Sequence, residues 1–431
     1  MYDAKYWGVR EYIYMKKIAL WVGLIFLAGL PPLFAAQEKI SGNALNPSIS
    51  LILDGRYTDL DQTALELPGF QLGGEAGLPE KGFALGHNEL IISSNIDDQF
   101  YGSMMAAIVQ EDGETVVELE EAYLETLRLG AGFTLKAGRF FSGMGYLNSI
   151  HDHVHDFADR PLVYDVLWGG HLADTGIQAR WVLPTDTYAM LGSEMTTGSV
   201  YPSGENDSGH RGLTLFAKTG GDFTASASWQ LGASYYQSQF DVRQAGAHAH
   251  GHDENEAGET AVVENELLDG EVDAAGVDFV YKWSPNGFAK QKNLKFQMEY
   301  FVRNEKGLSV LTEDEEASSA DYDGKHKGFY AQAVYQWRPA WRWGMRYDWL
   351  QAKNMIGEVS GADSDSTLFL EETSLATGSD PFKYTVMVDY AASHFSRIRL
   401  QYSQLDQGDE SDSVVMLQYN VSLGAHGGHT F

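Results

Sequence analysis

Apolar and polar residues alternate along much of the chain. In Trp341–Trp349 the odd positions are Trp, Trp, Met, Tyr and Trp, whereas the even positions are Arg, Gly, Arg and Asp. Phe382–Tyr390 shows the same alternation, with Phe, Tyr, Val, Val and Tyr on one side and Lys, Thr and Asp on the other. Successive side chains of a strand point to opposite faces, so both stretches predict strands with one apolar and one polar face.

Sixteen segments have the composition and the bounding turn residues of strands. They are Ser48–Tyr57, Leu85–Ile96, Phe100–Val109, Thr115–Leu127, Gly132–Phe141, Asp174–Leu183, Thr187–Thr196, Gly212–Thr219, Thr224–Phe240, Ala275–Trp283, Leu294–Asn304, Gly328–Trp337, Trp341–Leu350, Phe382–Ala391, Ser396–Leu405 and Val414–Leu423. In Thr115–Leu127 glutamates fall on both faces, so its register stays open. An even count is what single-chain bacterial barrels require, although a count from 14 to 18 stays open.

The gaps between these segments alternate in length. The even gaps are short: Asp97–Asp98, Gly130–Ala131, Pro184–Asp186, Gly220–Asp222, Ser284–Asn293, Arg338–Ala340 and Ala392–Phe395. Most odd gaps are long: Thr58–Ala84, Ser142–Ala173, Gly198–Arg211, Asp241–Ala274, Glu305–Lys327 and Gln351–Pro381, with Gln110–Glu114 and Asp406–Ser413 as exceptions. Short periplasmic turns and long extracellular loops alternate in this way in transmembrane barrels. The pattern predicts an all-β transmembrane antiparallel barrel of about sixteen strands.

The last nineteen residues, Ser413–Phe431, resemble the closing strand of bacterial outer-membrane barrels. Apolar and small or polar residues alternate from Leu417, and the chain shown stops on an aromatic residue. The resemblance implies that the apolar face meets lipid, that the polar face meets the lumen and that Phe431 is the signal to the barrel-assembly machinery. An edge strand of a soluble β-sandwich is the alternative, but a sandwich gives no reason for the alternating gaps. His426 and His429 interrupt the pattern, so we expect the strand to end near Ala425.

The beginning of the chain has the features of a secretory signal peptide. Two lysines follow Met15, an apolar run covers Ile18–Leu30, and small residues lead to Ala36. This order of a basic region, a short apolar region and small residues predicts cleavage, whereas the apolar run is too short for a confident membrane helix. We expect residues 1–36 to be removed, with Met15 as the true start, and residues 37–431 to form the barrel. Export of this kind places the protein in a Gram-negative outer membrane.

Composition excludes several classes of partner. The chain has 30 Lys and Arg against 60 Asp and Glu, a net charge of −30, and it has no cysteine. Strong acidity argues against nucleic acid as a partner. The lack of cysteine excludes disulfide scaffolds and thiolate metal sites. The acidity fits either the handling of cations or simple solubility, and composition does not decide between them.

The third extracellular loop, Ser142–Ala173, is the candidate constriction of the channel. In porins this loop folds into the lumen, and a sixteen-stranded barrel otherwise leaves an aqueous channel. Carboxylates of the loop that face arginines of the late strands would set a field across the channel that sorts solutes by charge. Alternatively, the arginines pair with nearby acids and only keep the wall polar. The predicted channel-lining residues are Arg338, Arg342, Arg346, Arg397, Arg399, Asp152, Asp156 and Asp159.

Most of the 13 histidines occur in clusters. In an extended segment, His-x-His places two imidazoles on one face, and imidazole binds zinc, copper or nickel. The fifth loop also carries many carboxylates, so we expect loose capture of metal by an acidic, His-bearing loop, unless the clusters arise by chance. No cofactor is required. The candidate ligands of Zn²⁺ or another divalent metal are His151, His153, His155, His248, His250, His252, His426 and His429.

Five stretches carry a resemblance to a known family. They read NPSISLILDGRY, GHNELIISSNIDDQFYG, VELEEAYLETL, LKAGRFFSGMGYLNSIHDHVHDFADRPLVY and SLGAHGGHTF. They are similar to zinc-regulated, TonB-dependent-receptor-like outer-membrane proteins, and more distantly the layout resembles phosphate-selective porins. The resemblance implies a barrel linked to zinc or related metal uptake. Only residues 37–47 precede the first strand of the mature chain, so no plug domain of the TonB-dependent type is expected.

These observations together predict a porin-like channel for small solutes or ions, linked to divalent metal uptake. Two alternatives stay open: a TonB-dependent-type receptor that works with a separate plug, and an outer-membrane barrel hydrolase. No placed nucleophile accompanies the His-Asp pairs of the third loop, so we expect a protein that is not an enzyme. The expected partners are outer-membrane lipid, the assembly machinery and a periplasmic metal-binding protein. Homo-oligomerisation stays open.

Overall fold

The computed structural model describes residues 47–62, 65, 67–111, 114–244, 263–313, 316–361, 365–408 and 411–424. Several predictions lie outside these residues: the signal peptide, the three histidines of the fifth loop, the two histidines of the C-terminal tail and Phe431. In the described ranges, no helix is long and apolar enough to span a membrane.

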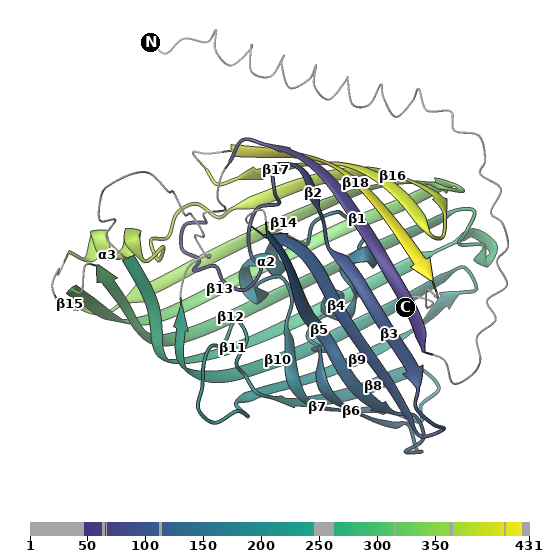
Figure 1. Ribbon diagram of the computed structural model, residues 1–431, viewed down its shortest axis with the longest axis horizontal. Coiled ribbons are helices and arrows are strands. Elements are labelled where there is room, and N and C mark those ends of the chain that lie inside the picture. Colours follow the sequence, from purple (N-terminus) through teal and green to yellow (C-terminus); the bar gives the residue numbers. More distant parts are fainter. Residues whose placement is uncertain are drawn as a thin grey trace, which may run out of the picture. The chain divides into compact units, whose positions relative to one another are not determined.

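The regular secondary structure of the described chain consists almost entirely of β-strands (Figure 1). Its short helical segments are η1 (Leu147–Ser149), η2 (Asp152–Val154), α2 (Leu162–Trp168), η3 (Pro285–Gly287) and α3 (Ser366–Glu372). Its strands are β1 (Ser48–Leu60), β2 (Gly82–Leu85), β3 (Asn88–Asn95), β4 (Phe100–Glu111), β5 (Glu114–Thr126), β6 (Phe133–Phe141), β7 (Ala173–Val182), β8 (Tyr188–Thr196), β9 (Gly212–Thr224), β10 (Ala227–Gln244), β11 (Val263–Trp283), β12 (Asn293–Glu313), β13 (Glu316–Arg338), β14 (Trp341–Ile356), β15 (Ser360–Gly361), β16 (Phe382–Ser393), β17 (Ser396–Asp406) and β18 (Ser411–Gly424).

Sixteen of the described strands form a closed antiparallel barrel. Each pairs with the next along the chain, and β1 closes the ring on β18, with Asp54 opposite Asn420. Two short strands are additions to this wall. Strand β2 pairs with β1 next to β3, and strand β15 pairs with β13 next to β14. One end of the barrel carries short turns and the other carries the long connections, so the predicted alternation holds. We call them the short-turn end and the long-loop end.

The two faces of the wall follow the predicted alternation. On β18, Tyr419 is 52% exposed on the outside, whereas Gln418 is 4% exposed on the inside. On β14, Met345 is 50% exposed, whereas Arg346 is 3% exposed. An apolar outer face and a polar inner face are what a barrel in lipid requires, because a charge facing lipid at mid-membrane costs about 2–4 kcal/mol.

A bulge explains why the register of β5 could not be read from the sequence. Met105 of β4 lies opposite Glu121, but the next residue, Ala106, lies opposite Leu119. Glu120 is therefore the extra residue, and both Glu120 and Glu121 are buried on the inside. A bulge shifts the alternation by one residue. The glutamates of β5 that would lie on opposite faces of a regular strand therefore face the lumen together.

Two predicted loops are instead extensions of the sheet. Most of the expected loop Glu305–Lys327 belongs to the hairpin β12–β13, and much of Asp241–Ala274 belongs to β10 and β11. At about 3.4 Å per residue, β13 is about 75 Å long. A strand that only crosses a bilayer has about 9–11 residues, so β13 is far longer than the crossing requires. These hairpins extend past the other strands at the long-loop end (Figure 1).

The lumen contains a hydrophobic core, which differs from the open channel that the strand number predicts. We call residues 67–76 and 142–172 the plug, because their side chains pack inside the barrel against β10 to β14. Helix α2 is part of the plug and lies inside the barrel (Figure 1). The plug supplies buried residues such as Leu67, Phe70, Leu72, Leu162, Val163, Leu167 and Trp168, and the wall supplies Tyr236, Phe301, Tyr330 and Leu350. The number of strands therefore limits the width of the lumen but does not show what fills it.

Candidate functional site in the barrel lumen

The plug is built around α2. Pro161 precedes the helix and Gly169, with φ +61°, ends it. Proline suits the start of a helix and a left-handed glycine suits its end. All residues of α2 except Asp165 are buried. A helix that is apolar on every side has to be enclosed, and here the barrel encloses it.

Glu299 of β12 holds the start of the third loop. Its carboxylate accepts hydrogen bonds from the backbone N–H groups of Tyr146 at 2.8 Å and Leu147 at 2.9 Å. It also accepts from the hydroxyls of Tyr164 at 3.0 Å and Tyr330 at 2.5 Å. Glu299 is fully buried. Four donors on one buried carboxylate fix the loop firmly against β12.

Ion pairs hold the middle of the third loop to the late strands. Arg346 donates to Asp159 at 2.9 Å, and Arg342 donates to Asp156 at 3.0 Å. Asp159 also pairs with Lys383 at 3.0 Å. The sequence interpretation left open whether these acids face the arginines across a channel or pair with them. The two groups form direct contacts, because the loop lies against the wall that carries the arginines.

The other predicted channel residues lie in three different places. Arg397 and Arg399 donate to the carbonyl oxygens of His153 and His155. Asp152 pairs within the plug with Arg160 at 3.0 Å. Arg338 is exposed at the short-turn end, at the end of β13.

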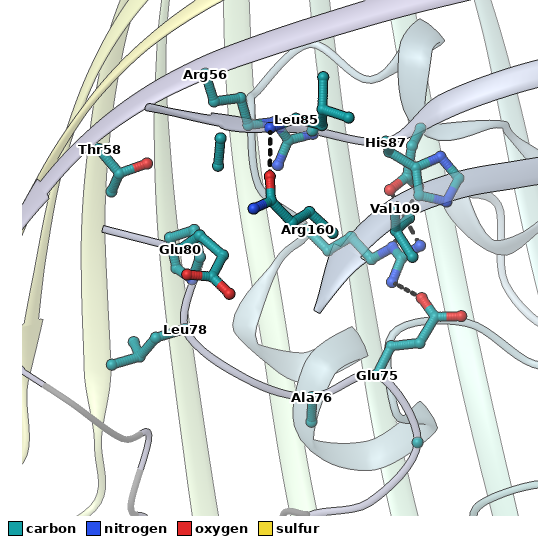
Figure 2. Close-up of a pocket in the computed structure, with 16 residues that line it drawn as sticks. Arg56, Thr58, Glu75, Ala76, Leu78, Glu80, Leu85, His87, Val109 and Arg160 are labelled. Atoms are coloured by element: carbon teal, nitrogen blue, oxygen red, sulfur yellow. Dashed lines mark hydrogen bonds and ion pairs between the residues drawn. The ribbon is translucent and has the colours of Figure 1, made fainter. Parts of the chain in front are cut away.

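An outer cavity of about 360 Å³ opens toward the long-loop end. Figure 2 shows Arg160 reaching across it to Glu75, at 2.7 Å, with His87 nearby. Burial alone would raise the pKa of the Glu75 carboxyl, but His171 and Arg160 outweigh that effect and lower the pKa to about 2. Arg56, on β1, lines the opposite side. The outer cavity thus contains both signs of charge, and Arg160 and Glu75 form an ion pair in it.

A narrow space, which we call the neck, lies below the outer cavity. Its volume is about 10 Å³, close to the space that one water molecule needs. Asp152 and Arg160 line both the outer cavity and the neck. His155 and His171 also line the neck. Burial lowers the pKa of His155 to about 4, although Asp152 opposes this, so the imidazole is neutral at pH 7.

An inner cavity of about 940 Å³ opens at the short-turn end. Ile150 lines both the neck and the inner cavity, so the three spaces follow one another along the lumen. Cations from six strands and from the turn before β12 line this cavity: Lys136, Arg180, Lys282, Lys290, Lys295, Arg342 and Arg397. Glu125 and Asp156 are the acids that line it. The inner cavity therefore has a strong excess of positive charge.

The structure brings together two of the three histidines of the third loop. The rings of His151 and His153 are 5.9 Å apart, and His153 Nδ1 lies 2.7 Å from Glu89 Oε2. His155 Nε2 instead faces the carbonyl oxygen of Ile150 at 2.9 Å. The segment was expected to be extended, but η2 turns the chain and separates His155. Within the described ranges, no group of three or more His, Asp and Glu side chains is arranged to hold a metal ion.

The half-buried Asp165 of α2 predicts a pH dependence of the plug. Burial raises the pKa of its carboxyl to about 7, while Lys383, Arg160 and Arg346 oppose the rise. Since the folded pKa lies above the ordinary value of 3.8, ionisation destabilises the plug as the pH rises from about 4 to 7. We expect D165N to raise the unfolding temperature by a few degrees at pH 8 and to have no effect at pH 4.

The measurement is heat-dependent gel mobility of the two proteins at each pH. Other groups, such as His155, titrate equally in both proteins, so the difference isolates Asp165. E371Q, on the exposed face of α3, is the control. An equal gain at pH 8 and pH 4 would contradict the assignment.

The comparisons with known proteins identify one relative by sequence. No family model matches the chain. A protein of Aquifex aeolicus (strain VF5), described as uncharacterized, is 30% identical over 421 residues, which cover 91% of this chain and 82% of the relative. The chain belongs to the family of this Aquifex aeolicus protein. The zinc-regulated and TonB-dependent parts of the sequence resemblance stay predictions.

Solved structures show the same fold at low identity. OmpT, an outer membrane protein of Vibrio cholerae folded in vitro, has a TM-score of 0.51 and 10% identity, covering 90% of this chain and 100% of that chain. Its loop L8 deletion mutant has a TM-score of 0.50 and 10% identity, covering 88% and 100%. The closed barrel and this likeness confirm the predicted transmembrane barrel and its outer-membrane location.

Proposed function

We propose that the protein is a porin-like channel for small solutes, and that its own plug narrows the path. The observation that carries the proposal is the succession of outer cavity, neck and inner cavity along the lumen, with shared lining residues. A separate plug domain of the TonB-dependent type is disfavoured, because the largest of these spaces, about 940 Å³, holds a small molecule and not a folded domain.

The arrangement at the neck supports selection by charge. Arg160 bonds to both oxygens of Asp152, at 3.1 and 3.0 Å, and to Glu75 at 2.7 Å. One guanidinium thus crosses the path and neutralises acids on two loops. A solute has to displace or pass this group, so its charge and size both matter.

Planar-bilayer recording tests the channel and its neck together. We expect small single-channel steps for the natural protein. R160Q removes the permanent cation that pairs with Asp152 at the neck and with Glu75 in the outer cavity, so it should raise conductance and shift the reversal potential toward cation selectivity. R211Q is the matched control, because Arg211 pairs with Asp241 at 2.7 Å outside these spaces. Absence of current in both the natural protein and R160Q would overturn the proposal.

Divalent metal transport is a second candidate function, supported by a group of side chains beside the neck. His87 lines the outer cavity, and His151 and His153 line the inner cavity. The buried Glu89 lies between them, 3.4 Å from His87 and 2.7 Å from His153. Imidazole and carboxylate groups are the donors that zinc prefers among those available here. Side chains would have to move to surround a metal ion.

Zinc should then alter the current at low concentration. We expect Zn²⁺ to reduce conductance in the natural protein and to have at least tenfold less effect on the double variant H151A/H153A. H210A, at an exposed position of another loop, is the control. If the double variant keeps the full response to zinc, this pair is not a metal site.

A further inference from the structure

We infer that the inner cavity is a binding site for small polyanions, meaning molecules that carry two or more carboxylate or phosphate groups. The inference rests on the proposed channel function for its biological meaning, since the site would be the chamber through which the solute passes. The binding itself follows from the charges of the cavity and can be tested without a membrane.

Cationic side chains outnumber acidic ones in the lining of the inner cavity. Seven Lys and Arg side chains line it against two acids. Arg180 and Lys136 share Glu125, at 2.5 and 3.9 Å. Lys295 and Arg342 share Asp156, each at 3.0 Å. Arg342 also pairs with the buried Asp389. Three carboxylates against the seven cations still leave a net positive field in an enclosed space, where field lines concentrate.

Arg397 points most directly to a missing anion. Its terminal nitrogens donate to the backbone oxygens of His153 at 2.9 Å and His155 at 3.3 Å. Within the described part of the chain, its buried Nε has no hydrogen-bond partner. Backbone carbonyls satisfy a donor but carry no net charge, so the charge of Arg397 lacks a direct counterion among the described residues. An anion in the cavity would supply one and would accept charge-assisted hydrogen bonds.

The size and lining of the cavity select the class of ligand. A volume of about 940 Å³ is at the upper end of small-molecule sites. Six of the cations come from β6, β7, β11, β12, β14 and β17, and Lys290 comes from the turn before β12, so they surround the space and do not form one patch. Charges spread around a chamber favour a ligand with several anionic groups over a single chloride. Tyr123 and Tyr146 add apolar surface for an organic body.

Calorimetric titration of the detergent-folded full chain tests the inference, with citrate and inorganic pyrophosphate as probes. We expect both to bind, with an affinity that falls as salt rises. K282E/K290E reverses two charges that line the cavity and should weaken binding at least tenfold. K325E/K353E makes the same change on neighbouring exposed residues of β13 and β14 at the long-loop end, and should bind as the natural protein does.

The outcomes separate this inference from the channel proposal. Heat-dependent gel mobility first shows that each variant is folded, and K282Q/K290Q replaces the reversal variant if it is not. Binding of one probe alone supports the site and identifies its anionic group as carboxylate or phosphate. Failure of the natural protein to bind either probe, or equal binding by both double variants, overturns the inference. A channel that conducts but does not bind would leave the proposed function standing.

Discussion

E299Q should open the barrel. Gln297 and Glu299 are both buried on β12, but the Glu299 carboxylate alone receives two backbone N–H groups of the third loop. A glutamine side chain has one oxygen and one NH₂ group. In either orientation, the NH₂ group faces the N–H of Tyr146 or of Leu147, and neither N–H can turn to become an acceptor. The plug therefore loses a charge-assisted hydrogen bond and gains a repulsion.

The expected cost is about 2–3 kcal/mol, the range for hydrogen bonds to charged groups and for an unsatisfied buried donor. If this cost falls on the docking of the third loop, the ratio of undocked to docked plug rises about 30-fold to 160-fold. Single-channel conductance should then rise several-fold, with longer openings. Gly145 supports this location, because a Cβ there would lie 2.3 Å from Glu299 Oε2, so only glycine fits against the carboxylate.

E313Q makes the same change at the exposed end of β12 and should leave the current unchanged. The barrel wall should stay intact in E299Q, so the heat-dependent mobility shift should persist. A variant with normal conductance would show that Glu299 does not hold the plug closed. Loss of the folded band would mean that the residue supports the wall, and conductance of the milder E299D would then decide.

The wall was predictable because each strand carries its own signal. Alternation placed Tyr419 outside and Gln418 inside, and the gap lengths placed the turns. The wrong predictions for the wall also have local causes. The bulge at Glu120 reverses the alternation without leaving any mark in composition, and β12 and β13 continue past the lipid because their polar ends still pair with each other.

The plug was harder to predict because its contacts are distant in sequence. Arg342 and Asp156 are 186 residues apart, and Tyr146 and Glu299 are 153 residues apart. Charge and composition identified both partners of the first pair as lumen residues but could not say that they touch. One signal was readable: a proline, an apolar run and a glycine predict the short helix α2 between Pro161 and Gly169. An apolar helix in a supposed channel loop indicates a plug.

R346M should release the middle of the plug and give the second large effect. The guanidinium donates to the Asp159 carbonyl at 3.0 Å, the Asp159 carboxylate at 2.9 Å and the Arg160 carbonyl at 3.1 Å. It also pairs with Asp348 at 2.9 Å. Methionine removes every one of these bonds and replaces the guanidinium, whose carbon lies 4.8 Å from the centre of the Phe157 ring, by an apolar group.

The cost of R346M should be about 3–5 kcal/mol, because Asp348 is fully buried and loses its cationic partner. Asp159 keeps Lys383 at 3.0 Å, so the damage centres on Asp348. Adding D348N removes the stranded charge and retains an oxygen for the N–H of Leu162, which Asp348 Oδ1 accepts at 2.9 Å. We therefore expect R346M to lower the unfolding temperature and raise conductance, and R346M/D348N to recover a large part of both.

R338M is the decisive control. The same pattern reading assigned Arg338 and Arg346 to the channel, yet Arg338 is exposed at the end of β13 and Arg346 is buried against the plug. If the arginines act only by lining the wall with charge, both variants should change selectivity and neither should change the size of the current. If the plug closes the lumen through Arg346, only R346M should enlarge the current. Equal effects of the two variants would contradict the plug as the barrier.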